Sequence, residues 1–231
     1  MQLYNRFATS RIDVFVYFLR IGKGIPHFPV YLLLGIVLWN FFVEMTMQSL
    51  SSIVGRGDLI RKIRIPRWMI VFSSSISATI NLFLSLIVVI VFMVINQVPI
   101  GVGILILPLY ALLIYLFALG CSLFLAAAYV KFRDLSYIWE VVLQAGFYAT
   151  PIIYPLQLIH DQFIVKILLL NPIAFAVQGA RYYLVTHETI TAQGVWGGSW
   201  YILVPLFFTI LILIFGLLYF KSQARTFAEN I

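Results

Sequence analysis

The residues best suited to chemistry in this 231-residue chain are basic side chains gathered in one short polar stretch, GRGDLIRKIRIPR at residues 55–67. The stretch lies between two long apolar segments. Placing its five cations at the centre of a bilayer would cost roughly 12 to 18 kcal/mol. The flanking segments are therefore predicted to cross a membrane, and this stretch is predicted to be a cytoplasmic loop. Its basic residues are Arg56, Arg61, Lys62, Arg64 and Arg67.

The same loop has the pattern of a short helix that lies along an interface. Asp58 can serve as its N-cap, and Ile65 should end it because a following proline disfavours helical geometry. Such a helix suits lipid headgroups or a partner protein, whereas the alternative is a positive anchor that only fixes topology. Its apolar face would hold Leu59, Ile60 and Ile63, and its basic face Arg61, Lys62 and Arg64.

Other chemical motifs are weak. The sequence has no G-x-x-x-x-G-K-[ST] phosphate loop, and its single cysteine and three histidines show no metal-ligand spacing, so neither a cofactor nor a metal is predicted in this chain. His160 and Asp161 are the candidate site of an alternative function, a polytopic membrane enzyme acting on lipid-linked sugars. Neighbours on one turn rarely reach the same atom, so this alternative is the less favoured one.

Composition indicates an integral membrane protein. Hydrophobic residues make up 63% of the chain and charged residues 10%, against about 25% charged in soluble domains, and the mean hydropathy is +1.04. The net charge of +7 follows from the loops and does not indicate nucleic-acid binding. The predicted fold class is all-α, a polytopic helical membrane protein.

Five segments are predicted to cross the membrane. A further apolar run, residues 14–19, is not predicted to cross, because Arg20 and Lys23 cut it off far short of the roughly 20 residues that a spanning helix needs. The fourth span is predicted to be interrupted, because Pro151 and Pro155 follow it four residues apart and cannot lie in an undisturbed helix. The spans are residues 28–53, 68–95, 100–130, 137–148 and 200–220.

Beyond the two prolines, residues 163–170 and 173–185 are each too short to cross comfortably, and Asn171-Pro172 joins them. They are predicted to be short re-entrant or interfacial helices on the outer side. Basic residues occur at 55–67, at 131–135 and after the last span. They place these two loops and the C-terminus in the cytoplasm, so the short helices fall on the opposite, outer side.

Two charges fall within apolar segments. Glu44 is predicted either to face a water-filled path or partner helix, or to take a hydrogen-bonded packing role. Arg181 is predicted to snorkel to headgroups, pair with an acid, or meet an anionic substrate.

With these features laid out, the chain resembles the permease subunits of ABC-2 type exporters, in particular the group that moves lipid-linked polysaccharide such as O-antigen, capsule or teichoic acid. The family's order and spacing are matched from about residue 27 onward. Residues 27–231 would form the permease domain, and residues 1–26 an atypical remnant of an apparently truncated N-terminus. The motifs that carry the resemblance are VYLLLGIVLWNFF at 30–42, SSIVGRGDLIRKIRIPRW at 51–68, KFRDL at 131–135, FYATPIIYPL at 147–156, and NP at 171–172 with the downstream Arg181.

The resemblance implies a permease in the bacterial inner membrane that exports a glycan or lipid-linked glycan. It would pair with a second copy as a homodimer and be driven by a separate ATPase subunit that binds ATP and Mg²⁺. Within the same family, a permease for a drug or small lipid is the alternative. Residues 58–65 would dock on the ATPase, assisted by Lys131, Arg133 and Asp134.

The family also has an outer gate of short helices, which residues 163–185 and the proline break before them would match. Its channel is lined with aromatic residues, a role that Phe147, Tyr148 and Tyr154 would take. Aromatic faces let sugar rings slide without tight polar binding, although interfacial packing explains the same aromatics. The residues implied for channel or gate are Glu44, Phe147, Tyr148, Pro151, Tyr154, Pro155, Asn171, Pro172 and Arg181.

Overall fold

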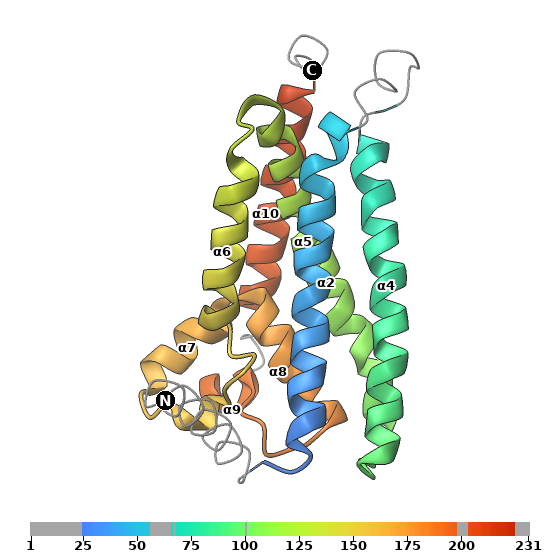
Figure 1. The fold of residues 1–231 in the computed structure, drawn as a ribbon. Coiled ribbons are helices and arrows are strands. Elements are labelled where there is room, and N and C mark those ends of the chain that lie inside the picture. Colours follow the sequence, from blue (N-terminus) through green and yellow to red (C-terminus); the bar gives the residue numbers. More distant parts are fainter. Residues whose placement is uncertain (1–24, 56–65, 67, 100, 198–202, 225–231) are drawn as a thin grey trace, which may run out of the picture.

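A computed structural model describes residues 25–55, 66, 68–99, 101–197 and 203–224. These residues form helices and connecting turns with no strand among them, so the predicted all-α class is confirmed (Figure 1). The helices are α2 (Phe28–Gly55), α4 (Trp68–Ile95), η2 (Val102–Ile106), α5 (Leu107–Lys131), α6 (Leu135–Ala149), η3 (Leu156–Leu158), α7 (Gln162–Leu170), α8 (Pro172–Leu184), α9 (Ala192–Trp196) and α10 (Leu203–Gln223).

Four of the five predicted spans correspond to long apolar helices in the described residues. They are α2, α4, the continuous stretch Val102–Lys131 and α10, each long and apolar enough to cross a bilayer. The fifth, α6, has only 15 residues and so measures about 22 Å, less than the roughly 30 Å of a hydrocarbon core. It ends at Ala149, just before the two prolines, so the predicted interruption limits its length.

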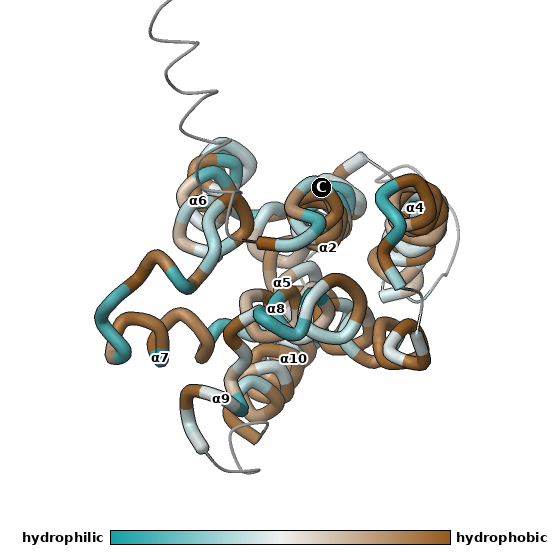
Figure 2. The backbone as a smooth tube through the Cα atoms, turned by 90° about the horizontal axis from the view of Figure 1, so that it is seen from below, coloured by the Kyte–Doolittle hydropathy of each residue, from teal (hydrophilic) through white to brown (hydrophobic). Residues whose placement is uncertain are grey.

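Helix α2 lies between α4 and α6. Seen from below in Figure 2, α4 and α6 lie on either side of α2, and α5, α8 and α10 follow one behind another on one face of this row. The tightest crossing joins α5 to α10, where a Cβ atom added to Gly216 would overlap the carbonyl oxygen of Gly120. Small residues at such crossings let two helix backbones touch, which is a common way to join helices in a membrane.

The two short helices α7 and α8 meet at an angle of 104°, with Asn171 at the bend. Asn171 caps α8, because its side-chain oxygen accepts a hydrogen bond from Ile173 N at 3.0 Å, and Pro172 occupies the first helical position. The prediction of two short helices joined by Asn171-Pro172 is confirmed.

The bundle has two unlike ends (Figure 1). At the upper end lie the last residue of α2, the first of α4, the turn between α5 and α6, and the last described residues of α10. At the lower end lie α7, α8, α9 and the turn at Asn96 and Gln97. One end therefore holds simple helix-to-helix connections, and the other holds the broken and re-entrant segments.

Candidate functional site

The most highly connected side chain at the broken end is Arg181, which α8 carries in its last turn. Its guanidinium group is fully buried and donates three hydrogen bonds to backbone carbonyls. Nε donates to Tyr31 O at 2.9 Å, Nη1 to Pro151 O at 2.8 Å, and Nη2 to Ile152 O at 2.7 Å. The guanidinium carbon also lies 3.8 Å from the centre of the Tyr31 ring, a cation–π contact.

These bonds explain how the chain tolerates a break beside a membrane-spanning helix. The carbonyls of Pro151 and Ile152 lie beyond the end of α6, where no further helical turn can satisfy them. An unpaired carbonyl in an apolar environment costs several kcal/mol. Arg181 supplies donors to both, and through Tyr31 it ties the break to α2. The break is therefore anchored to α2 and α8 at once.

Two further residues shape this anchor. A Cβ atom added to Gly35 would overlap Arg181 Nη2, so glycine at this position of α2 makes room for the guanidinium. One turn before Arg181, Gln178 Oε1 accepts a hydrogen bond from Tyr31 Oη at 3.4 Å. Residues of α2 and α8 that are about 150 positions apart in sequence thus form one polar cluster inside an apolar bundle.

The placement of Arg181 bears on the three roles expected from sequence. The side chain does not reach the protein surface, and no carboxylate among the described residues forms an ion pair with it. In this conformation Arg181 holds the backbone of the break at Pro151 and Ile152 against α2. Its role in a gate stays a prediction.

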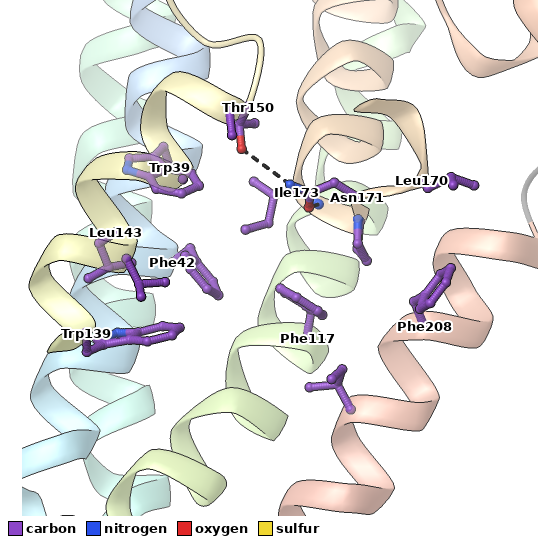
Figure 3. A pocket seen from close by; sticks show the side chains of 15 residues that line it. Trp39, Phe42, Phe117, Trp139, Leu143, Thr150, Leu170, Asn171, Ile173 and Phe208 are labelled. Atoms are coloured by element: carbon purple, nitrogen blue, oxygen red, sulfur yellow. Dashed lines mark hydrogen bonds between the residues drawn. The ribbon is translucent and has the colours of Figure 1, made fainter. Parts of the chain in front are cut away.

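A cavity of about 460 Å³ lies between α2, α5, α6, α8 and α10 (Figure 3). Five of its 15 lining residues are aromatic and none is ionisable, so the cavity suits apolar chains or flat ring faces and offers no acid–base chemistry. Phe42 stands at the centre of the ring contacts, 5.6 Å from Trp39, 5.7 Å from Phe117 and 6.3 Å from Trp139 between ring centroids. Phe208 of α10 adds a ring on the opposite side of the cavity.

Two helix surfaces create most of this wall. Trp39, Phe42 and Thr46 share one face of α2, and Trp139 of α6 donates from Nε1 to Thr46 Oγ1 at 3.1 Å. At the edge nearest α8, Asn171 Nδ2 donates to Thr150 Oγ1 at 3.3 Å, drawn as a dashed line in Figure 3. Asn171 therefore joins the end of α6 to the start of α8 in addition to capping α8.

The aromatics expected to line a path lie elsewhere. Phe147 packs against Trp39 with ring centroids 6.0 Å apart, and Tyr148 is 69% exposed. Tyr154 donates from Oη to Tyr148 O at 3.2 Å. None of the three lines the cavity, and their channel role stays a prediction.

Of the residues named from sequence for a channel or gate, Asn171 and Pro172 line the cavity, whereas its aromatic lining was missed although a signal existed. Lining residues repeat at helical spacing on both walls, at positions 39 and 42 of α2 and at positions 139, 143 and 146 of α6. Two such stripes on separate helices indicate facing surfaces. The missed lining residues are Trp39, Phe42, Phe117, Trp139 and Phe208.

Glu44 takes a packing position between two helices. Its Oε1 accepts a hydrogen bond from Gln48 Nε2 at 2.7 Å and a second from Asn81 Nδ2 of α4. The hydrogen-bonded alternative considered for Glu44 therefore describes its contacts in this structure. The bond to Asn81 joins α2 to α4.

The prolines of the break and the His160-Asp161 pair have local structural roles. Pro151 and Pro155 are buried, and Pro155 precedes the short helix η3. The Asp161 carboxylate caps α7 by accepting from Phe163 N at 2.8 Å, while His160 Nδ1 lies 3.2 Å from Leu158 O. The two side chains do not meet at a common atom. Over the part of the chain described, no three His, Cys, Asp or Glu residues are grouped to hold a metal ion.

The expected docking residues are only partly visible. Residues 58–64, which include Asp58, Leu59, Ile60, Arg61, Lys62, Ile63 and Arg64, lie outside the described residues. Lys131, Arg133 and Asp134 are exposed in the turn between α5 and α6. This turn lies at the same end of the bundle as the last residue of α2 and the first of α4, which flank the undescribed stretch.

Comparison with known proteins identifies the family. The model of the ABC-2 type transporter family matches residues 2–185. An O-antigen export system permease protein RfbA from Myxococcus xanthus is 29% identical over 211 residues, covering 90% of this chain and 78% of the relative. A protein of the same name from Klebsiella pneumoniae is 26% identical over 226 residues, covering 97% of this chain and 84% of the relative. The family match, which spans most of the chain, and the four long apolar helices show that this integral membrane protein belongs to the ABC-2 type transporter family.

Proposed function

We propose that this chain is the permease subunit of an ABC exporter that moves a polysaccharide or lipid-linked glycan across the bacterial inner membrane. The observation that carries this proposal is the pair of similar relatives, both named as O-antigen export permeases and matched over at least 90% of this chain. The fold supports it, because four long apolar helices form a membrane domain that ends in broken and re-entrant segments on one side only.

A separate ATPase would bind ATP and Mg²⁺ and drive the transport. The sequence has no phosphate-binding loop of its own, and its most basic stretch, residues 55–67, connects α2 to α4. We expect residues 58–65 to dock on the ATPase, with the exposed Lys131, Arg133 and Asp134 beside them. This end of the bundle would be cytoplasmic, together with the C-terminal end of α10.

Helix α2 would carry the motion from the ATPase to the outer end. Its last residue, Gly55, adjoins the proposed docking stretch, and near its first turn the Tyr31 carbonyl accepts a hydrogen bond from Arg181. The helix has 28 residues and is about 42 Å long, so it spans the whole bundle. A displacement of α2 would therefore be transmitted to α8 and to the break at Pro151, which together would act as the outer gate. Two permease copies would form the path between them.

The docking step is tested by charge reversal. A variant with Arg61→Glu, Lys62→Glu and Arg64→Glu, expressed with the partner ATPase, should lose ATPase co-purification because the basic face is inverted. Membrane insertion should be retained, since the apolar spans are untouched. Lys221→Glu at the same end of the bundle is the matched control. Undiminished co-purification of the triple variant would reject the docking role.

The cargo is tested in cells. A strain whose own polysaccharide permease is deleted should regain surface glycan when this chain and its ATPase are supplied. Restored resistance to a drug without surface glycan would instead favour the alternative cargo, a drug or small lipid.

A further inference from the structure

A second cavity, of about 730 Å³, lies at the outer end of the bundle, apart from the aromatic cavity and from the Arg181 anchor. It is enclosed by the start of α7, the chain that follows α8, and α9. Its volume falls within the roughly 300 to 1,000 Å³ typical of small-molecule sites. Most of the side chains around it are polar, in contrast to the rest of the bundle, and the six used below are His160, Gln162, Tyr182, His187, Glu188 and Gln193.

The backbone around this cavity is held in place by specific hydrogen bonds. Gln157 Nε2 donates to Glu188 O at 2.8 Å, and Thr189 Oγ1 donates to Thr186 O at 3.0 Å. Val165 of α7, which is 4% exposed, closes the apolar floor. The cavity is thus formed by an ordered loop packed on two helices.

The polar side chains in the cavity wall are available to a ligand. Within the described part of the chain, the side chains of Gln162 and Gln193 and the carboxylate of Glu188 form no hydrogen bond to another residue. The rings of Tyr182 and His187 lie 4.8 Å apart at an angle of 69°, which adds an aromatic wall. Amides and a carboxylate can pair with hydroxyl groups that both donate and accept, and an aromatic face packs against the C–H face of a sugar ring.

The charges around the cavity limit the class of ligand that it can bind. Its lining includes the Glu188 carboxylate but neither lysine nor arginine. A phosphate or uronate group would meet a like charge there without a permanent cation to pair with, which disfavours binding. We infer that this cavity is a binding site for one or two units of an uncharged saccharide on the outer side of the membrane. The inference rests on the proposed glycan cargo and makes that cargo more specific.

Binding is measured by titration calorimetry and saturation-transfer NMR on the full chain in lipid nanodiscs. The probes are mannotetraose and a matched pair, (1→4)-linked galactotetraose and tetragalacturonate, which differ in the carboxylates at C6. At least one neutral tetrasaccharide should bind, and tetragalacturonate should bind about tenfold more weakly than galactotetraose. Glu188→Ala and Gln193→Ala should each lower the affinity for the neutral saccharide about tenfold, because each substitution removes a hydrogen-bonding partner. Glu140→Gln and Gln144→Ala, exposed on α6, are the matched controls.

Three results would each overturn the inference. The chain could bind none of the neutral probes, the cavity variants could bind the saccharide as tightly as the control variants, or the chain could prefer tetragalacturonate to galactotetraose. The surface-glycan assay in cells separates this result from the proposed function. Restored export by a chain that binds none of the probes would reject the cavity and keep the permease. Loss of export with intact saccharide binding would reject the permease and keep the cavity.

Discussion

Helices α4 and α8 show that an apolar sequence and a buried position are different properties in this protein. Only eight of the 28 residues of α4 are buried, and its outer face exposes large apolar side chains such as Phe83 and Ile87, at 63% and 58%. Eleven of the 13 residues of α8 are buried, including Gln178 and Arg181. The reason is that lipid is as apolar as a protein core, so hydrophobic side chains face outward and the interior can hold small and polar residues.

The same contrast separates the two kinds of helix contact. Helix α4 packs mainly on α2, and its buried residues form a narrow stripe that includes the small residues Ser75 and Ala78, which permit close approach. Helix α8 is held on several sides, by the arginine bonds, by its cap at Asn171 and by α5. A substitution should therefore cost much more in α8 than on the outer face of α4.

The largest effect is expected for Arg181→Ala. The carbonyls of Pro151 and Ile152 would lose their donor, and leaving buried acceptors unpaired costs about 1 to 3 kcal/mol each. The Tyr31 carbonyl lies within α2 and would lose only its second donor, together with the cation–π contact of the Tyr31 ring. We expect the free energy of unfolding in detergent, followed by tryptophan fluorescence, to fall by about 3 kcal/mol or more. Arg133→Ala, an exposed arginine, is the control. Equal stability of the two variants would show that the anchor does not stabilise the break.

An intermediate effect is expected for Gly216→Ala in α10, a helix that is as exposed as α4 over much of its length. The new Cβ atom would overlap the Gly120 carbonyl, so α5 and α10 would have to separate, at a cost of about 1 to 3 kcal/mol. Gly55→Ala serves as the control, because a Cβ atom there meets nothing within 4 Å. The same unfolding assay compares them, and indistinguishable stabilities would mean that this crossing can relax without loss.

The smallest effect is expected within α4 itself. Val89 is 1% exposed and Val91 is 50% exposed, so valine-to-alanine changes at the two positions compare the packed and outer faces of one helix. We expect Val89→Ala to cost roughly 1 kcal/mol through the cavity it leaves, and Val91→Ala to cost almost nothing. Thermal unfolding midpoints measured side by side provide the check. A larger loss at Val91 would indicate that this face is covered by protein.

Much of the fold follows from the sequence because its signals are local. The long apolar segments, the break after α6 and the two short helices at Asn171-Pro172 were all predicted, since proline geometry, capping and apolar length act within a few residues. The channel aromatics are a different case. The prediction named Phe147 and Tyr148 because they belong to a recognisable motif, FYATPIIYPL at 147–156, whereas the described cavity is lined by Trp39, Phe42 and Trp139.

The sequence by itself determined that this is a helical membrane protein, which stretches form its four long apolar helices, and the family whose motifs it carries. The tertiary structure alone decided what Arg181 does. Its partners are backbone carbonyls, and one of them belongs to Tyr31, 150 positions away. Every residue has a backbone carbonyl, so the sequence does not show which of them accepts a hydrogen bond from Arg181. Only the packing of α8 against α2 and the proline break brings them within reach, and that packing depends on contacts across the whole bundle.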